Sequence, residues 1–309
     1  MRFLVTGATG FVGFAVCTEL AQRNYDVSRA VRRYSGSGGG YFELGDIGPA
    51  TNWPRALMGV DAVIHLAARV HITREGPVNP LKEFRKVNVA GTESLAKAAA
   101  ESGIKRFVFV SSIGVNGAET VLGKPFSETD KPNPHNAYAL SKCEAEQDLQ
   151  RIAAETGMEV VIIRPPLVYG PDAPGNFGSL MHWLRRGVPL PLGAIHNQRS
   201  LVALDNLVDF IVTCITHPKA ANQTFLVSDG QDLSTTELVR GMAQAAGVPA
   251  RLLPVPVWAL QAGGALLGRG DAVQRLCGNL QVDISRARSL LGWVPPVSVE
   301  EGLRRAMAL

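Results

Sequence analysis

The sequence predicts an α/β protein with a doubly wound parallel sheet and a smaller mixed α/β lobe at its C-terminal end. Short apolar segments alternate with amphipathic segments through the first half of the 309-residue chain, which is the pattern of strands and crossover helices. A glycine-rich turn follows the first apolar segment directly. After Pro165 and Pro166 the alternation weakens, and Pro and Gly become more frequent. This arrangement is typical of a Rossmann domain followed by a second lobe.

Each element is predicted from its own pattern of apolar residues. The first strand is expected at 2–6, and the first helix, 11–22, carries apolar residues at helical spacing. Gly157 should end the helix expected at 136–155, because glycine readily adopts the left-handed conformation found at helix ends. The other strands are expected at 25–31, 41–45, 62–66, 106–110 and 160–164, and the other helices at 81–101, 136–155, 206–216, 235–246 and 285–291.

The segment 255–267 is the most apolar stretch of the second half. It is shorter than the roughly 20 residues that a helix needs to span a bilayer, so we expect a packed helix and no membrane span. No secretory signal precedes the first strand, and the four cysteines lie far apart without a C-x-x-C pair. These features predict a cytoplasmic protein with reduced, mostly buried thiols.

Charge and histidine content narrow the possible functions. The formal net charge is +4, and aromatic residues make up 6% of the chain, whereas nucleic-acid binding needs clustered basic residues and stacking platforms. Adjacent arginines occur only as isolated pairs, such as Arg32-Arg33 and Arg185-Arg186. The six histidines include no H-x-x-x-H pair, so the sequence predicts neither nucleic-acid binding nor a metal site.

The turn Gly7-Ala8-Thr9-Gly10-Phe11-Val12-Gly13 predicts a dinucleotide site. Gly7 allows the tight turn, Gly10 lets a pyrophosphate approach the backbone, and Gly13 lets the helix pack closely on the strand. The start of the helix, at Phe11 and Val12, then presents free N–H groups to the anion.

The end of the second strand predicts which dinucleotide is bound. NAD-binding proteins place a carboxylate there, about 20 residues beyond the turn, to bind the ribose 2′-hydroxyl. Asp26 comes too early, and Arg32 and Arg33 occupy the expected place. Guanidinium groups pair well with a 2′-phosphate, so the sequence favours NADP(H), with NAD(H) as the alternative. Asp46 and Ile47 are expected to line the adenine pocket.

Three side chains form the expected catalytic set. Tyr138 and Lys142 have the spacing Tyr-x-x-x-Lys on a predicted helix and therefore share a face. The lysine ammonium is expected to lower the tyrosine pKa, so that Tyr138 can exchange a proton with a sugar hydroxyl or carbonyl. Ser112 ends the preceding strand at the ligand-binding edge of the sheet and should hydrogen-bond the reacting oxygen. Ser111 should support it, and Lys142 should also hold the ribose hydroxyls of the cofactor.

Further motifs occur between and after these residues. They are Asp46-Ile47, His65-Leu66-Ala67-Ala68, Asn88-Val89-Ala90-Gly91-Thr92, Ser111-Ser112 and Arg164-Pro165-Pro166-Leu167-Val168-Tyr169-Gly170-Pro171. In this order, and with the glycine turn, the set resembles the extended short-chain dehydrogenases/reductases, and within them the NAD-dependent epimerase/dehydratase family of sugar-nucleotide enzymes. The resemblance covers nearly the whole chain.

The resemblance implies how the cofactor is held. Leu66, Ala67 and Ala68 would pass close to its nicotinamide side. Asn88 would steady the central helix against the neighbouring strand. Pro165 would contact the carboxamide through its backbone.

The resemblance also implies a site for a UDP-linked sugar and a way to dimerise. Asn176, Arg199 and Arg275 would bind the substrate's diphosphate, where planar guanidinium groups suit phosphate oxygens. Relatives often form a homodimer by packing two helices of each copy into a four-helix bundle. Here these helices are 81–101 and 136–155, whose apolar positions are equally compatible with an ordinary core.

Some positions depart from the family pattern and bear on the reaction. Ile113 and Gly114 follow the catalytic serine where 4,6-dehydratases have an Asp-Glu pair, so a dehydratase is not expected. Arg32 stands where the typical 4-epimerase has an acidic residue, and Leu167 where epimerases often have asparagine.

The favoured hypothesis is therefore a reductase. NADPH would deliver hydride to C4 of a nucleotide sugar, a UDP-4-keto-6-deoxy-N-acetylhexosamine used for polysaccharide, and Tyr138 would protonate O4. The alternative is a UDP-glucose or UDP-N-acetylglucosamine 4-epimerase that uses bound NAD. A non-catalytic, cofactor-sensing protein is a minor alternative, because the catalytic set is complete. Residues 1–165 would form the NAD(P)-binding domain and 166–309 mainly the substrate lobe, with about 198–216 returning to the first domain.

Overall fold

A parallel sheet forms the centre of the molecule. The computed structural model describes residues 1–34, 36, 39–70 and 79–308. Within this part of the chain, seven strands pair in the order β3-β2-β1-β4-β5-β6-β9, and every neighbouring pair is parallel. The order reverses between β1 and β4, which is where doubly wound sheets bind their ligands. The strands are β1 (Arg2–Thr6), β2 (Asp26–Val31), β3 (Tyr41–Glu43), β4 (Ala62–His65), β5 (Arg106–Val110), β6 (Glu159–Arg164) and β9 (Thr224–Leu226).

The predicted sheet and each strand predicted for the first half are confirmed, with boundaries that shift by one or two residues. The largest shift is in β3, which ends at Glu43 instead of residue 45. Gly45 has a φ of +68°, and a residue in this left-handed region turns the chain out of the extended conformation.

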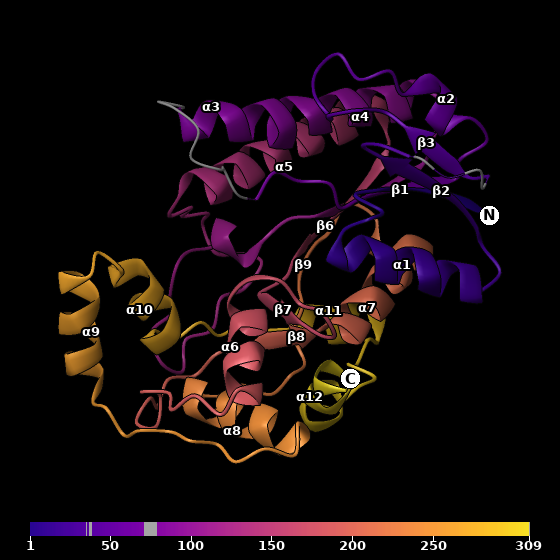
Figure 1. Cartoon of the computed structure of the whole chain (residues 1–309). Coiled ribbons are helices and arrows are strands. Elements are labelled where there is room, and N and C mark those ends of the chain that lie inside the picture. The colour runs from indigo at the N-terminus through magenta and orange to yellow at the C-terminus, as the bar shows by residue number, and fades with distance from the viewer. Residues whose placement is uncertain (35, 37–38, 71–78, 309) are drawn as a thin grey trace.

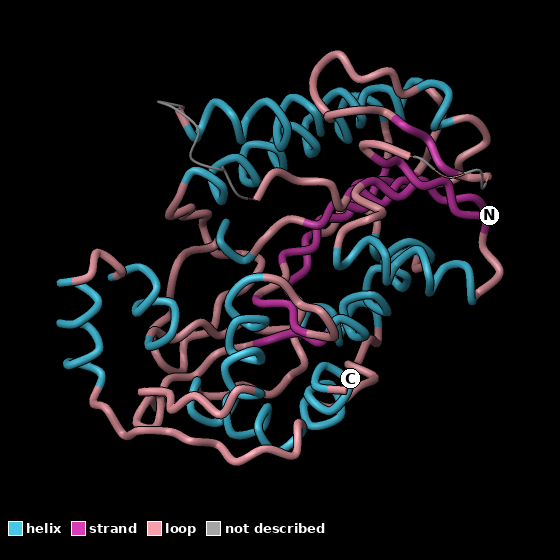
Figure 2. The backbone as a smooth tube through the Cα atoms, in the orientation of Figure 1, coloured by secondary structure: helices cyan, strands magenta, loops and turns pink. Residues whose placement is uncertain are grey.

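Helices cover both faces of the sheet (Figures 1 and 2). Successive side chains of a strand point to opposite faces, so Phe3 and Val5 pack into one core while Leu4 packs into another. The first core is closed by α1 (Phe11–Gln22), α7 (Leu204–Thr216) and α11 (Ser285–Leu291), and the second by α2 (Pro54–Leu57), α4 (Ala90–Glu101) and α5 (Ala137–Thr156).

The long helix expected at 81–101 is interrupted. It consists of α3 (Pro80–Phe84), a π-helical turn (Arg85–Val89) and α4. Asn88 lies in the π-helical turn and is 1% exposed. Single π-turns inside α-helices occur mostly at functional sites, and this one turns the Asn88 side chain toward the groups that it binds.

The second half of the chain builds a lobe below the carboxyl ends of the strands (Figure 1). It has its own core, which includes Tyr169, Phe177, Leu238 and Leu303. The sequence did not predict most of this lobe, because its strands are short and its helices follow loops. Its elements are β7 (Leu167–Tyr169), α6 (Gly175–Arg185), β8 (Leu201–Ala203), α8 (Thr235–Ala245), α9 (Val257–Leu266), α10 (Gly270–Cys277) and α12 (Val299–Met307).

Two elements of the second half of the chain pack into the first domain. The edge strand β9 and helix α7 come from the second half, yet β9 pairs with β6 and α7 packs with α1 in the core below the sheet. The proposed division at residue 165 stays a prediction.

The helix expected at 255–267 is confirmed as α9, but it is packed along one side only. Gly264 is its one buried residue, and Trp258, Leu266 and Leu267 are 72%, 89% and 76% exposed. The physical reason is that α9 stands outside the lobe beside α10 (Figure 1), so only a narrow side of it finds a partner. No helix in the described part of the chain is long and apolar enough to cross a membrane.

The outward face of α4 and α5 carries ion pairs. Arg151 bonds Glu93 at 3.0 Å and Asp148 at 3.2 Å, and Arg85 lies 2.5 Å from Glu144. The apolar residues of both helices, such as Leu95 and Leu149, are buried in the core against the sheet. The homodimer through a four-helix bundle stays a prediction.

All four cysteines are free, as the sequence predicts, and Cys17, Cys143 and Cys214 are buried. Burial raises the pKa of Cys17 to about 11. Its thiolate is therefore scarce at neutral pH, and the thiol reacts slowly.

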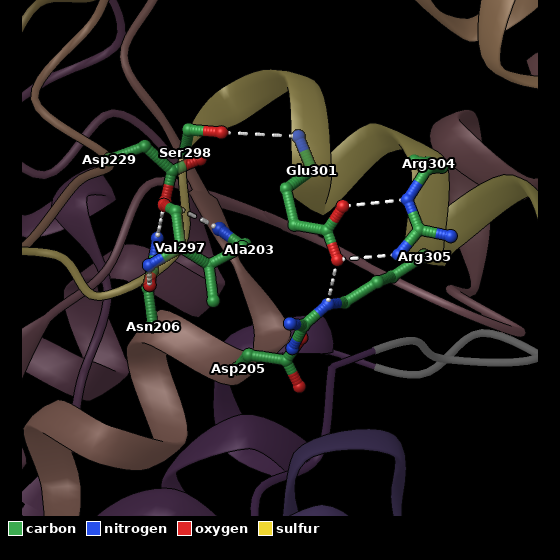
Figure 3. A network of polar contacts seen from close by, with 9 residues as sticks. All are labelled: Ala203, Asp205, Asn206, Asp229, Val297, Ser298, Glu301, Arg304 and Arg305. Atoms are coloured by element: carbon green, nitrogen blue, oxygen red, sulfur yellow. Dashed lines mark hydrogen bonds and ion pairs between the residues drawn. The ribbon is translucent and has the colours of Figure 1, made fainter.

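A polar network fastens the end of the chain to the sheet side of the lobe (Figure 3). Asn206 on α7 is fully buried, donates to the carbonyl of Val297 at 2.8 Å and accepts from the Val297 N–H at 2.9 Å. Its amide also donates to Asp229 at 2.7 Å, and Asp229 accepts from the Ala203 N–H at 2.8 Å. The segment before α12 is therefore held by hydrogen bonds that water cannot replace.

We expect Asn206→Ala to lower the free energy of unfolding by about 3 kcal/mol, because it leaves buried backbone groups of Val297 without partners. The matched control is Asp205→Ala, next to it, whose carboxylate forms an exposed ion pair with Arg305. Such a pair contributes under about 1 kcal/mol. Urea unfolding of both variants measures the difference, and equal losses would contradict the role given to Asn206.

Candidate active site

The predicted site residues gather where four central strands end. Gly7 follows β1, Leu66 follows β4, Ser111 follows β5 and Pro165 follows β6. Carboxyl ends of parallel strands lie at one edge of a sheet, and this edge faces the lobe of the second half (Figure 1). Residues scattered over most of the chain are thereby brought to one place.

The glycine turn has the geometry that a pyrophosphate needs. A Cβ on Gly13 would lie 2.0 Å from the carbonyl oxygen of Gly7, and a Cβ on Gly7 would lie 2.9 Å from the backbone nitrogen of Ala67. Gly10 caps α1 without a side-chain hydrogen bond, and no acidic residue occupies the first turn. The N–H groups of Phe11 and Val12 therefore remain available to an anion at the positive end of the helix.

Two predicted cofactor residues contact each other beside this turn. The Arg32 Nε lies 3.0 Å from Asp46 Oδ1, and both side chains are about four-fifths exposed, at 78% and 83%. A surface pair of this kind is weak, so Arg32 can leave the Asp46 carboxylate and bind another anion. Ile47 lies against α4, because a Cβ on Gly91 would come within 2.7 Å of its side chain.

A buried chain of hydrogen bonds begins at the last residue of β1. The Thr6 hydroxyl accepts from the N–H groups of Leu66 and Ala67, both at 3.2 Å, and lies 2.7 Å from His65 Nδ1. The other ring nitrogen, Nε2, lies 2.9 Å from the hydroxyl of Thr92, which donates to the Asn88 carbonyl at 2.7 Å.

These partners determine the proton positions. Thr92 gives its hydroxyl proton to Asn88 and so accepts from His65 Nε2–H, which leaves Nδ1 to accept the proton of Thr6. Burial, and then the charge of Lys142, lower the pKa of His65 to about 3. The imidazole is therefore neutral at physiological pH, with its proton on Nε2.

The chain of hydrogen bonds continues to α5. The Asn88 amide donates to the carbonyl of Arg69 and to the hydroxyl of Ser141, both at 3.0 Å. Ser141 donates to the carbonyl of Tyr138 at 2.7 Å. Asn88 thus joins the segment after β4 to α5, and the expected steadying role is given a definite set of partners.

Tyr138 lies in the first turn of α5, with its ring edge on Phe84 at 6.0 Å between centroids. Burial raises the pKa of Tyr138 to about 12. The expected lowering by Lys142 is therefore wrong for the ligand-free protein. The reason is that Lys142 is itself 1% exposed, and burial lowers its pKa to about 7 despite the opposing charge of Glu146, so its ammonium is only partly charged near neutral pH.

Lys142 is aimed into the site with few partners. Its Nζ lies 3.9 Å from the centroid of the Phe109 ring, and no oxygen in the described residues accepts a hydrogen bond from it. Glu146, one turn further along α5, is engaged by Arg164 in a buried ion pair at 2.5 Å, and Arg164 also donates to Asn116 at 2.9 Å. The ammonium is thus left free for a ligand's hydroxyl groups.

The two serines lie beside the start of α5. The Ser112 hydroxyl accepts from the Gly114 N–H at 3.1 Å, and a Cβ on Gly114 would contact both that hydroxyl, at 3.3 Å, and Ala139, at 3.2 Å. Glycine at position 114 therefore lets the serine and the tyrosine's helix approach. The Ser111 hydroxyl is buried and has no hydrogen-bond partner within the described residues, which marks a place for a missing polar ligand.

Two of the three predicted diphosphate residues lie together. Arg199 is largely buried and donates to the Gly278 carbonyl at 2.9 Å. Burial, and then the charge of Arg275 on α10, lower the pKa of Arg199. Neither guanidinium forms an ion pair within the described residues, so both are available to a dianion. Asn176 is exposed at the start of α6, and no contact joins it to either arginine in the described part of the chain.

Sequence reasoning missed several residues that position the site. Thr6, Thr92 and Ser141 hold the hydrogen-bond chain, and Glu146 and Arg164 form the ion pair behind Lys142. Thr92 and Arg164 belong to motifs that the resemblance already contained. The signal for Glu146 was its position four residues after Lys142, on the same face of the helix. The contacts of all these residues with cofactor and substrate stay predictions.

The fold and this site define an enzyme of the extended short-chain dehydrogenase/reductase class. A family model described as the NAD dependent epimerase/dehydratase family matches residues 3–228. The chain belongs to this family, as its motifs predicted.

Individual relatives agree. A UDP-glucose 4-epimerase of Vibrio cholerae is 50% identical over 305 residues, covering 98% of this chain and 93% of that protein. An N-acetyl-α-D-glucosaminyl-diphospho-ditrans,octacis-undecaprenol 4-epimerase of Escherichia coli O157:H7 is 29% identical over 321 residues, covering 98% and 93%. The UDP-glucose 4-epimerase of Thermotoga maritima, solved with UDP-glucose, superposes with a TM-score of 0.77 at 25% identity, covering 99% of this chain and 97% of that one.

These findings bear on two expectations from the sequence. The family is described as NAD-dependent, and the expected preference for NADP(H) finds no support. These three relatives are named 4-epimerases, and the one at 50% identity favours the alternative function over the reductase.

The neutral His65 predicts how stability depends on pH. In the unfolded chain a histidine binds a proton below about pH 6.5, whereas in the folded protein the pKa of His65 is about 3. Protonation therefore favours the unfolded state, and stability is lost as the pH falls from about 6.5 towards 3. From pH 7 to pH 5 this one group should cost about 2 kcal/mol.

We expect His65→Gln to remove that part of the loss, whatever its effect on stability at pH 7. Urea unfolding at the two pH values measures it, and the exposed substitution His182→Gln is the control that should keep the wild-type dependence. An unchanged dependence in His65→Gln would refute the neutral, buried imidazole.

Proposed function

We propose that the protein is an NAD-dependent 4-epimerase of a UDP-linked hexose. The observation that carries the proposal is the placement of Tyr138 and Lys142. Both come from α5, with Lys142 Nζ 3.9 Å from the centroid of the Phe109 ring of β5 and the Tyr138 ring against Phe84, and neither has a hydrogen-bond partner for its reactive atom among the described residues. Support comes from the Vibrio cholerae relative, at 50% identity over nearly the whole chain.

The residues present fit a bound dinucleotide. The glycine turn leaves no room for side chains, the N–H groups of Phe11 and Val12 are free, and the Ser111 hydroxyl is buried without a partner. Lys142 would hold the nicotinamide ribose, and the loop after β4, fixed by Thr6, would border the ring. When bound, NAD⁺ supplies the acceptor and then the donor of hydride for C4 of the sugar.

The protein's own groups manage the proton. Tyr138 takes the proton of the C4 hydroxyl as hydride leaves C4, which gives a 4-keto sugar, and returns it to O4 after hydride has been restored to the opposite face. Ser112 hydrogen-bonds the same oxygen. With its pKa at about 12, Tyr138 begins as a phenol and must release its own proton to solvent before it can accept one from the sugar. A fully charged ammonium on Lys142 would favour that phenolate.

Arg199 and Arg275 would bind the diphosphate of the substrate. Both epimerase relatives carry names that describe a sugar joined through phosphate groups, one to UDP and one to undecaprenol. The diphosphate is the chemistry that the two arginines recognise. UDP is proposed here because the relative at 50% identity and the solved Thermotoga structure both act on UDP-glucose.

The experiment is interconversion of UDP-galactose and UDP-glucose, and of their N-acetylated forms, with NAD⁺ and no added reductant. We expect product without net change in reduced-nicotinamide absorbance. Tyr138→Phe should lower kcat by about a hundredfold or more and leave NAD⁺ binding intact. Full activity in that variant would remove the mechanism, and no interconversion of any of the four sugars would remove the proposed function.

A 4-ketoreductase is the second candidate, favoured by Arg32 directly after β2 and by Leu167 in β7, where epimerases often have asparagine. If Arg32 binds a 2′-phosphate, Arg32→Ala should weaken NADPH binding about tenfold and leave NADH binding unchanged, because one charge-assisted hydrogen bond is lost. Fluorescence titration of both cofactors checks this. Equal affinities in wild type and variant would show that Arg32 does not read the phosphate, and stoichiometric oxidation of NADPH by a UDP-4-keto-6-deoxy-N-acetylhexosamine would establish the reductase.

A further inference from the structure

A buried ion pair that the proposed chemistry does not use lies one helical turn from Lys142. Glu146 follows Lys142 by four residues on α5, so the two side chains share a face of the helix. Arg164, the last residue of β6, donates from Nε to Glu146 Oε1 at 3.0 Å and from Nη2 to Oε2 at 2.5 Å. The side chains of Glu146 and Arg164 are 3% and 6% exposed. Both oxygens of the carboxylate are therefore bonded where water has little access.

Stability alone does not explain a buried ion pair. Such a pair often stabilises a fold no more than well-packed apolar residues of the same volume, because both charges lose their hydration. The planar fork of a guanidinium offsets part of this loss when it meets both carboxylate oxygens. Arg164 thereby allows a charged carboxylate at a depth where an unpaired one would be costly.

The third guanidinium nitrogen of Arg164 joins the ion pair to the serine side of the site. Nη1 donates to Asn116 Oδ1 at 2.9 Å, and Asn116 is 2% exposed. The Asn116 N–H donates to the carbonyl of Ile113 at 2.9 Å and so closes the short turn that Ser112 begins. The carboxylate is therefore fixed relative to both Ser112 and α5.

Glu146 is the charged side chain that acts on Lys142. The groups that surround the lysine are His65 on β4, the Phe109 ring on β5, Tyr138 and Glu146 on α5, and, beyond Glu146, the guanidinium of Arg164 on β6. His65 has a pKa of about 3 and Tyr138 one of about 12, so both are neutral from about pH 5 to about pH 9. Burial lowers the pKa of Lys142 to about 7, and the Glu146 carboxylate opposes that fall.

We propose that Glu146 is a positioning residue whose buried carboxylate keeps the Lys142 ammonium charged and in place, and that Arg164 fixes this carboxylate in its ionised form. The use of that charge in the reaction rests on the proposed function, in which the ammonium favours the Tyr138 phenolate. Without a counter-charge, a lysine buried this deeply would lose its proton more readily, and the tyrosine would have no cation beside it.

The test follows the protonation of Lys142 directly, by NMR of the ligand-free protein labelled with ¹³C at the lysine Cε atoms. The other lysines are exposed, so Lys142 is identified by its low titration midpoint and by the loss of its signal in Lys142→Met. We expect Glu146→Gln to lower this midpoint by about one pH unit or more, because a neighbouring opposite charge is removed.

The matched control is Glu144→Gln. It removes a carboxylate from the same helix, two residues from Lys142, but residues at this spacing do not face each other. Glu144 is instead paired with Arg85, at 2.5 Å. The Lys142 midpoint of this variant should equal that of the wild type.

A double variant keeps the test valid if Glu146→Gln alone fails to fold, which is a risk because it leaves the Arg164 charge buried without its partner. Glu146→Gln with Arg164→Met removes both charges. The Lys142 midpoint should then lie below that of the wild type but above that of the single variant, since the repulsion from Arg164 is also gone. An ion pair with a purely structural role gives no such order.

An unchanged Lys142 midpoint in the Glu146 variants overturns the proposal, and so does an equal shift in Glu144→Gln. In the epimerase assay, kcat should be lost as Lys142 loses its proton, so Glu146→Gln should move the alkaline limb of the kcat profile to lower pH by the same amount as the midpoint. A limb that stays in place also overturns the proposal. If the wild type interconverts none of the sugars, the proposed function fails, while the NMR midpoints still decide whether Glu146 holds the charge of Lys142.

Discussion

The hydrogen-bond chain that starts at Thr6 is the constraint on which the site depends. It runs through His65, Thr92, Asn88 and Ser141 to the carbonyl of Tyr138. Its links join β1, β4, the π-helical turn and α5, which are elements from distant parts of the sequence. Each donated proton in it has one acceptor, so the hydrogen-bond chain has a single arrangement of protons. Buried networks that are fully satisfied in this way specify one geometry, and here that geometry places the backbone of Tyr138 relative to the ends of β1 and β4.

Much of this could be predicted from the sequence, and the reasons are local. The strands β1, β4, β5 and β6 contain short apolar runs, the glycine turn needs residues without side chains, and Tyr138 and Lys142 share a helix face by spacing alone. The lobe could not be predicted as well. Its strands β7 and β8 have three residues each, too few for a period, and α6 follows a proline-rich loop. The extent to which α9 is covered was mispredicted, because an apolar sequence does not reveal whether another element packs on each side of the helix.

The chemistry of the site was harder to predict than its composition. The spacing of Tyr138 and Lys142 suggested a lowered tyrosine pKa, but spacing carries no information about burial. Burial raises the pKa of Tyr138 and lowers that of Lys142, which moves the two values apart and leaves the phenol neutral and the ammonium only partly charged near neutral pH. Similarly, Arg32 at the end of β2 suggested a phosphate, yet the fold places Asp46 beside it. Asp46, which follows β3, can therefore supply the carboxylate that is lacking at the end of β2.

The pairing of Arg199 with Arg275 has a consequence for the whole molecule. Two like charges held near each other, one of them mostly buried, cost the folded state free energy that the unfolded chain does not pay. A dianion bound between them would remove that cost and bind only the folded form. By mass action, a ligand that binds only the folded form would stabilise it. The fraction of folded chains would therefore rise with the concentration of such a dianion, and the protein would be least stable when the dianion is absent.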